Sequence, residues 1–288
     1  MKSLGRIAAI TGNTLTELTR QKAFHFLLLF ALLLIGSSAV AARLTLQQEL
    51  QVLKDIALGA ISIFTSLLAI IATARLLPQE VEEGTVHTIL AKPVYRIEYL
   101  LGKLAGVFLL LFIATAVMTM LFVVVLQLRQ HAVISETVRQ MAGAPRDQAD
   151  AALAGARAAG FNINLLEAIL LLLVQAWVLA AMTLFISSFA TSTLYTIVTV
   201  VFVYLIGHLQ GTVREYWLES NSTGPLAQLF LAVVALCFPD LQLFNPADDV
   251  AAGALLPLAL LGRTAGLGVF YITVCLLLTW IAFERKEL

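Results

Sequence analysis

The chain has 288 residues, of which 60% are hydrophobic and only 12% are charged. An average soluble domain is about 25% charged, and few soluble folds could cover this much apolar surface, so we expect a membrane protein. The 18 Lys and Arg residues balance the 18 Asp and Glu residues, which argues against a nucleic-acid partner.

Residues 1–22 have the pattern of an amphipathic helix. Apolar residues recur at steps of three and four from Leu4 to Leu18, while Lys and Arg residues mark the other face. A basic amphipathic helix that runs straight into an apolar segment is expected to lie in the membrane interface. The alternative is a loosely ordered tail.

Six apolar segments follow, and each comes close to the ~20 residues that a helix needs to cross the hydrocarbon layer. The first is too long for the core of a cleavable signal peptide and is interpreted as a true span. We therefore predict an all-α, polytopic membrane protein with one transmembrane domain over residues 1–288. The six predicted spans are residues 23–42, 56–74, 104–126, 165–185, 194–209 and 264–283.

Two connecting regions are long enough to hold structure of their own. Residues 127–164 are rich in Gln, Ala and Arg and predict two short polar helices with a turn near 143–145, but no separate core. Residues 210–261 contain apolar pieces at 226–238 and 251–261, each too short to cross. We expect short re-entrant or interfacial helices there. If 226–244 crosses instead, the C-terminus moves to the other side.

The Lys and Arg residues near the ends of the short connections set the orientation. If the N-terminus lies in the cytoplasm, more than half of the 18 Lys and Arg residues of the chain lie on the cytoplasmic side. The C-terminus then lies on the cytoplasmic side too. We expect both regions 127–164 and 210–261 to be extracytoplasmic and the link 43–55 to be a short polar connection. The cytoplasmic basic residues are Lys2, Arg6, Arg20, Lys22, Arg75, Lys92, Arg96, Lys103, Arg285 and Lys286.

The segment 77–96 is the densest run of charge, Pro and Gly between two apolar segments. Three acidic residues are followed by Gly84 and Thr85, which predict a break and an N-cap, and Pro93 fits the first turn of the next helix. Such an irregular segment at the ends of two membrane helices suits docking to a partner better than chemistry.

Residues 75–106 combine an acidic cluster, Gly-Thr, a short apolar helix, Lys-Pro-Val-x-Arg and Leu-Gly-Lys. This combination resembles the first cytoplasmic loop of ABC-2 type ABC-transporter permeases, most closely those linked to multicopper-enzyme maturation. The resemblance implies that 75–103 is a coupling loop whose helix sits in a groove of an ATP-binding subunit. It also implies two such subunits, and a second copy of the chain or a homologous permease. The implied coupling residues are Glu80, Glu82, Glu83, Gly84, Thr85, His87, Ile89, Pro93 and Arg96.

No catalytic motif accompanies these features in the sequence. A Gly-x-x-x-x-Gly-Lys-Ser/Thr run is absent, so ATP-driven work would require ATP and magnesium in a separate subunit. Cys237 and Cys275 have neither metal-site nor redox spacing, and Met118 and Met120 point to different helix faces, so no copper path is supported. We expect no catalytic residue, cofactor or metal in this chain.

Three residues are candidates for a transport path. Gln175 is the most central polar group of the fourth span, where it forms either a helix–helix hydrogen bond or part of a pathway. Phe238 and Phe244 lie beside Pro residues in region 210–261 and either end short helices or form an outer gate.

These observations favour the permease subunit of an ATP-driven exporter in the inner (cytoplasmic) membrane, in contact with lipid and not itself an enzyme. The alternative is a non-transporting anchor or scaffold for an ATPase or an assembly partner. An intramembrane enzyme would need paired carboxylates, a Ser/Lys dyad or a His cluster at membrane depth, and the sequence has none of these.

Overall fold

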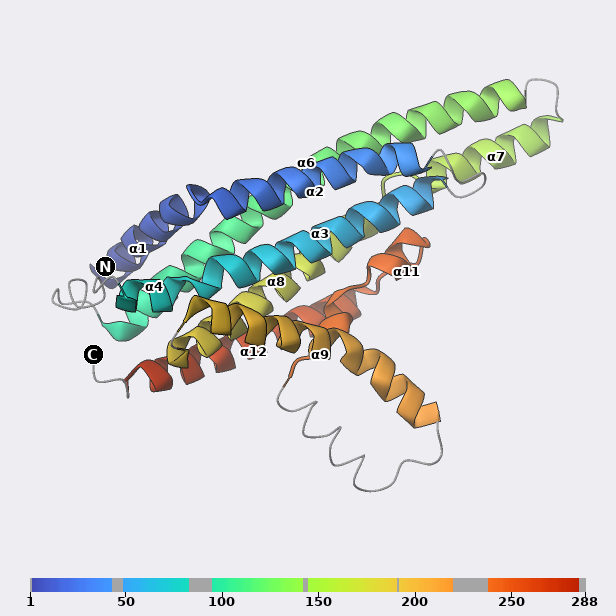
Figure 1. The fold of residues 1–288 in the computed structure, drawn as a ribbon. Coiled ribbons are helices and arrows are strands. Elements are labelled where there is room, and N and C mark those ends of the chain that lie inside the picture. Colours follow the sequence, from blue (N-terminus) through green and yellow to red (C-terminus); the bar gives the residue numbers. More distant parts are fainter. Residues whose placement is uncertain are drawn as a thin grey trace.

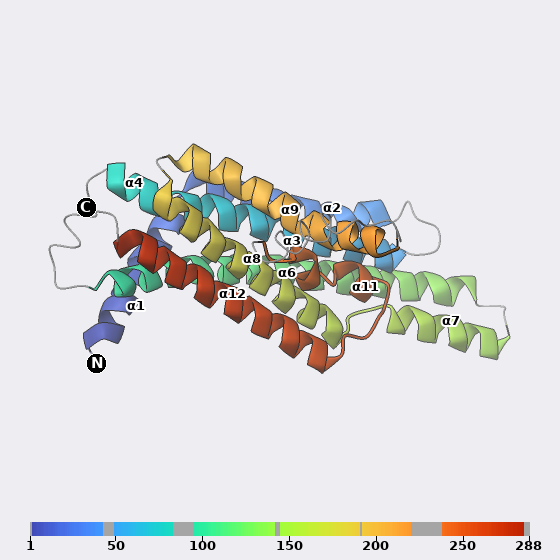
Figure 2. The same ribbon diagram turned by 90° about the horizontal axis from the view of Figure 1, so that it is seen from below.

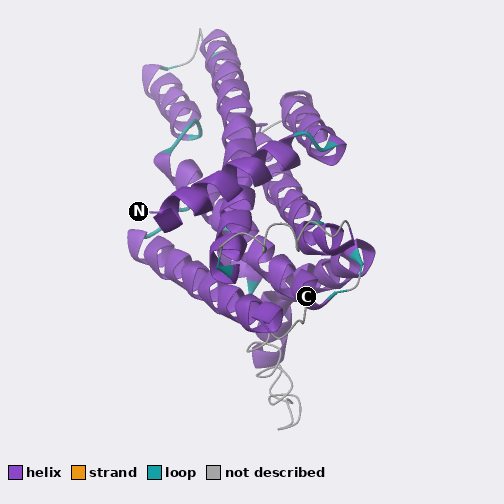
Figure 3. Cartoon of the chain, turned by 90° about the vertical axis from the view of Figure 1, so that its left-hand side faces the viewer, coloured by secondary structure: helices purple, strands orange, loops and turns teal. Residues whose placement is uncertain are grey.

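The computed structural model describes residues 2–42, 49–82, 95–141, 145–190, 192–219 and 238–284. Within these ranges every regular element is a helix (Figures 1 and 3). Six helices are long and apolar enough to cross a membrane. The prediction of an all-α, polytopic membrane protein is therefore confirmed.

The described elements are α1 (Lys2–Thr19), α2 (Lys22–Ala42), α3 (Glu49–Ala74), α4 (Leu76–Glu82), α6 (Arg96–Gln140), α7 (Arg146–Ala158), α8 (Ile163–Phe189), α9 (Thr193–Glu219), η1 (Leu241–Phe244), α11 (Ala247–Ala251) and α12 (Leu258–Glu284).

Several helices are longer than the apolar segments that predicted them. Helix α3 begins at Glu49, so half of the predicted polar link 43–55 is helical. Helix α6 has 45 residues, about 68 Å at 1.5 Å per residue, which is far more than a bilayer core requires. The polar residues after Leu126 contain no Pro or Gly before Gly143, so nothing in this stretch ends the helix. Helix α7 then folds back along this extension (Figure 1).

Helices α3 and α8 form the centre of the bundle. In their most apolar windows, 72% and 78% of the residues are buried, against 22% in both α2 and α12. Helix α8 packs against α3, α6, α9 and α12, while α2 packs against α3 and α6. The apolar surface that α2, α6, α9 and α12 leave exposed is what a helix presents to lipid.

The bundle has two distinct ends (Figures 1 and 2). Helix α1, helix α4, the start of α6 and the end of α12 gather at one end. The start of α3, helix α7 and helix α11 lie at the other. In region 210–261 the structure describes two short helices, η1 and α11, which lie between the two apolar pieces and were not predicted at these positions. The apolar piece at 226–238 lies outside the described residues except for Phe238. The expected short helix at 251–261 is wrong, because α12 begins at Leu258, directly after Pro257.

Candidate coupling site

The predicted coupling loop leaves the bundle through α4. Helix α3 ends at Ala74, and after Arg75 the short α4 packs against α8 through the buried side chains of Leu76 and Leu77. Glu80 and Glu82 lie in the second half of α4, although their side chains are outside the described residues. The acidic cluster therefore begins on a helix that contacts the centre of the bundle.

Most of the remaining predicted coupling residues cannot be placed. Glu83, Gly84, Thr85, His87, Ile89 and Pro93 lie outside the described residues, and so does the short helix predicted after Thr85. Their role in coupling stays a prediction.

Arg96, the first residue of α6, contacts the end of α12. Its Nη1 donates hydrogen bonds to the carbonyl oxygens of Phe283 and Glu284, each at 3.0 Å. The last carbonyls of a helix have no partner within the helix, so Arg96 supplies part of the C-terminal cap of α12. Its guanidinium carbon lies 5.9 Å from the centre of the Phe283 ring, and that ring stacks on Tyr99 at 6.2 Å. Arg96 thus joins the exit of the predicted loop to the last span.

The next two turns of α6 form a seat for α1. A Cβ atom built on Gly102 would lie 2.7 Å from the Ile10 side chain, and one on Gly106 would lie 2.7 Å from that of Thr14. The hydroxyl of Thr11 also donates to the carbonyl oxygen of Gly102 at 3.2 Å. Only glycine at these two positions lets the backbones approach this closely.

Charged pairs flank the seat. Arg6 Nη1 lies 3.3 Å from Glu98 Oε2, and Lys103 Nζ lies 3.7 Å from Glu17 Oε2. The Lys103 side chain is 3% exposed, and its ammonium group also lies over the Tyr99 ring. Opposite charges at both ends of the contact orient α1 along α6. The amphipathic helix predicted for residues 1–22 is therefore present, and it is packed on a neighbouring helix.

The sequence carries a signal for this seat that hydropathy and charge do not reveal. Gly102 and Gly106 are four residues apart, the spacing that lets two membrane helices approach closely. Gly207 and Gly211 repeat it on α9, where they receive Leu241 and Gln242 of the η1 region. The same spacing at 262–266 faces open space among the described residues, so spacing alone does not identify a contact.

The three candidate path residues have different surroundings. Gln175 is completely buried in α8, and neither polar atom of its amide has a hydrogen-bond partner among the described residues. Phe244 is also buried, and it approaches α12 at Gly268, close to Val174 of α8. Phe238 is half-buried at the edge of the core. A pathway role for these residues stays a prediction.

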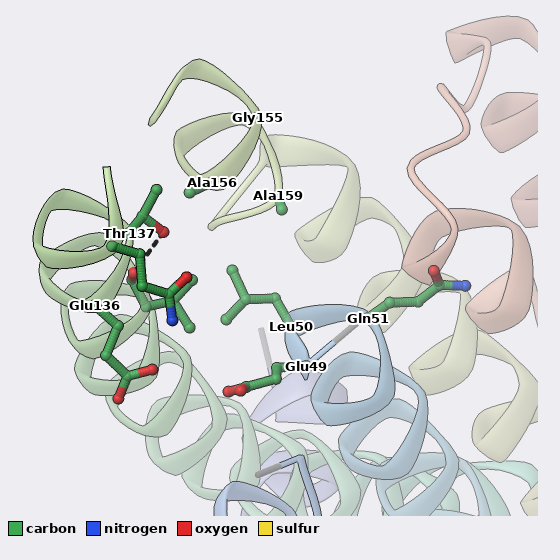
Figure 4. A pocket seen from close by; sticks show the side chains of 10 residues that line it. Glu49, Leu50, Gln51, Glu136, Thr137, Gly155, Ala156 and Ala159 are labelled. Atoms are coloured by element: carbon green, nitrogen blue, oxygen red, sulfur yellow. Dashed lines mark hydrogen bonds between the residues drawn. The ribbon is translucent and has the colours of Figure 1, made fainter. Parts of the chain in front are cut away.

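The opposite end of the bundle holds a polar cleft of about 410 Å³ between α3, the extension of α6 and α7 (Figure 4). Glu49 and Thr137 are among its lining residues, and the α7 side consists of Gly155, Ala156 and Ala159. Glu49 also forms an ion pair with Arg129 of α6, whose side chain is 8% exposed.

Among the described residues, no group of three His, Cys, Asp or Glu side chains is placed to hold a metal ion. The contacts of Arg96, Gly102 and Gly106 join helices to one another.

Residues 8–288 match the family model described as ABC-2 family transporter protein. No curated protein was found to match the chain.

Proposed function

This chain belongs to the ABC-2 family of transporter proteins, and from that premise we propose that it couples ATP hydrolysis in a separate subunit to export. As a member of that family it is a multi-pass membrane protein and the membrane subunit of an ABC transporter. The proposal adds the direction of transport, the site of coupling and the composition of the complex: two ATP-binding subunits and a second permease chain. Within the family, the motif over residues 75–106 supports a place near the permeases linked to multicopper-enzyme maturation.

One observation carries the proposal: several helices of the bundle meet where the predicted docking segment joins it. The segment begins within α4, which packs on the central helix α8, and it ends at Arg96, which caps α12. The first turns of α6 then hold α1 through Gly102 and Gly106. A push on the segment would therefore reach the centre and two outer helices of the bundle at once.

The roles within the segment follow from its residue types. Glu80, Glu82 and Glu83 would provide the charges that basic residues of the ATPase contact, while Thr85, His87 and Ile89 would form the docking face. Gly84 and Pro93 would shape the segment, and Arg96 would anchor it. In this arrangement the end of the bundle with α1, α4 and the last turn of α12 faces the cytoplasm, and the membrane is the inner one.

Charge reversal tests the coupling directly. In vesicles that contain the complete complex, Glu83→Lys should lower transport per ATP hydrolysed by about tenfold, the factor that corresponds to 1.4 kcal/mol of lost docking energy. Glu136→Lys, an exposed carboxylate on the distant part of α6, is the matched control and should leave the ratio at the wild-type value. Unchanged coupling in Glu83→Lys with normal membrane insertion would contradict the role of this residue.

The second candidate function is a membrane anchor that holds an ATPase without transporting anything. An anchor would use the same docking segment as a transporter. The two functions differ in whether cargo changes the rate of ATP hydrolysis. Hydrolysis that rises when a candidate cargo is enclosed with the reconstituted complex supports transport, and hydrolysis that ignores every cargo while the complex stays assembled supports the anchor.

A further inference from the structure

A cavity and a groove follow one another along the contact between α6 and α12, which we call the α6–α12 seam. At the ends of the two helices is a cavity of about 480 Å³, lined by Tyr95, Arg96, Ile97, Trp280 and Glu284. Further along the seam is a groove of about 300 Å³, lined by Leu101, Leu104, Ala105, Phe108, Ile272, Thr273 and Leu276.

The groove continues the cavity toward the middle of the membrane. Leu101 lies one turn after Ile97 on α6, and Leu276 lies one turn before Trp280 on α12, so both levels use the same two helix faces. The groove is apolar, because its one hydroxyl, that of Thr273, donates to the carbonyl oxygen of Val269 at 2.8 Å. The end cavity and the apolar groove lie in the same order as the polar headgroup and the acyl chain of a lipid.

The end cavity carries both signs of charge. The guanidinium of Arg96 is held there by its two hydrogen bonds to α12, which both use Nη1. Its Nε and Nη2 have no partner within the described residues and remain available as donors. The first turn of α6 adds the positive end of a 45-residue helix, and Tyr95 provides no side-chain cap for it. A phosphate group is the anion that such a donor set suits.

Glu284 supplies the opposite charge at the end of α12. Its carboxylate and the negative end of that helix favour an ammonium group. The cavity also has two aromatic walls, Trp280 and the 72% exposed Tyr95, the residue types enriched where membrane helices meet the headgroup region.

We propose that the α6–α12 seam binds a phospholipid with a primary ammonium group, its phosphate at Arg96, its ammonium at Glu284 and an acyl chain in the groove. Within the described residues no ion pair involves Glu284, so a headgroup with net negative charge would bring a further negative charge to its carboxylate. A trimethylated ammonium has no N–H group to donate to that carboxylate. This lipid site is independent of the proposed coupling to an ATPase, since it requires only that α6 and α12 span the membrane.

Lipid binding to the purified full-length chain can be measured by native mass spectrometry. The probes are phosphatidylethanolamine, phosphatidylcholine and phosphatidylglycerol with identical acyl chains. The wild type should bind phosphatidylethanolamine about tenfold more tightly than phosphatidylcholine, because only the former donates a charged hydrogen bond to Glu284. Glu284→Gln should remove this preference, whereas Glu136→Gln, far from the seam, should retain it.

The acyl-chain part has its own variant. Ala105→Trp should fill the groove and weaken binding of all three lipids. If that variant does not fold, Leu101→Trp tests the same groove from an exposed position.

Two results would overturn the site: equal binding of phosphatidylethanolamine and phosphatidylcholine by the wild type, or an unchanged preference in Glu284→Gln. Displacement of the lipid by an equal concentration of glycerophosphoethanolamine, which lacks acyl chains, would likewise contradict the role of the groove. Resistance to this displacement supports a lipid over a soluble phosphate compound.

Discussion

Arg96 shows how one residue can belong to two parts of the molecule. By sequence it closes the predicted docking segment, and by contact it is part of the C-terminal cap of α12, 187 residues further along the chain. Its planar guanidinium reaches two carbonyl oxygens and at the same time covers the Phe283 ring. A lysine at this position would supply charge without this geometry.

Arg96→Gln should therefore loosen the end of α12. Loss of the two charged hydrogen bonds should destabilise the protein by about 1–2 kcal/mol, and the thermal midpoint in detergent should fall by a few degrees. Arg96→Lys should recover part of the loss. A melting curve of Arg96→Gln that superimposes on that of the wild type would show that the cap contributes nothing measurable.

The Glu49–Arg129 ion pair has a comparable position at the opposite end. It joins the first turn of α3 to the extension of α6, and the Arg129 side chain is nearly buried. Removal of one member of such a pair leaves the other charge without compensation, which costs more than the pair contributes. The pair therefore helps to hold the extension against the bundle.

Glu49→Gln should release the extension of α6 together with α7. We expect a loss of about 1–3 kcal/mol, below the range for fully buried pairs because a quarter of the Glu49 side chain is exposed. Amide hydrogen exchange should become faster in residues 127–158 and stay unchanged in α12. Uniform exchange rates in variant and wild type would mean that packing alone holds the extension.

At the scale of elements, α1 and α6 behave as one unit through their glycine seat. Gly102 and Gly106 remove the side chains that would keep the two backbones apart, and the Arg6–Glu98 and Lys103–Glu17 pairs set the orientation. The helix that leaves the predicted docking segment therefore carries the N-terminal helix with it.

Gly106→Ala should separate α1 from α6, because the new Cβ atom would lie 2.7 Å from Thr14 Cβ and 3.1 Å from the backbone oxygen of Thr11. Overpacking of this kind costs about 1–3 kcal/mol. Spin labels at the exposed positions Thr16 and Leu109 should report a longer and broader distance distribution.

Gly12→Ala is the matched control on α1, since its Cβ atom would have open space around it. It should leave the distance between the labels unchanged. Equal distributions in Gly106→Ala and the wild type would rule out the seat as the attachment of α1.

The number and order of spans were predictable because runs of about 20 apolar residues have few alternatives in a membrane. Helix ends were less predictable, because hydropathy indicates which residues lie in the lipid layer. It does not indicate where the backbone hydrogen bonds of a helix stop. The polar residues after Leu126 illustrate this: they leave the apolar segment and yet continue α6 as far as Gln140.

The coupling site was predictable only in part. Charge, Pro and Gly residues mark the segment 77–96 in the sequence, and Arg96 at its end is among the predicted coupling residues. The partner of Arg96 was not predictable, because the Phe283 and Glu284 contacts use backbone carbonyl groups that every residue has. The glycine spacing was visible, but it occurs three times and receives a packed neighbour in two of those places.

At the scale of the whole molecule, the two ends of the bundle differ in construction. One end gathers α1, α4, the start of α6 and the end of α12 (Figure 2). The other projects the α6–α7 hairpin beyond the bundle (Figure 1). An ATPase that drives this family member should therefore contact the first end alone.

Photo-crosslinking in the assembled complex tests this claim most directly. A photoreactive amino acid at His87, within the predicted docking segment, should crosslink to the ATP-binding subunit, and the same group at Gln140, at the far end of α6, should not. Crosslinking from Gln140, or none from His87 in a complex that hydrolyses ATP, would contradict the proposed coupling site.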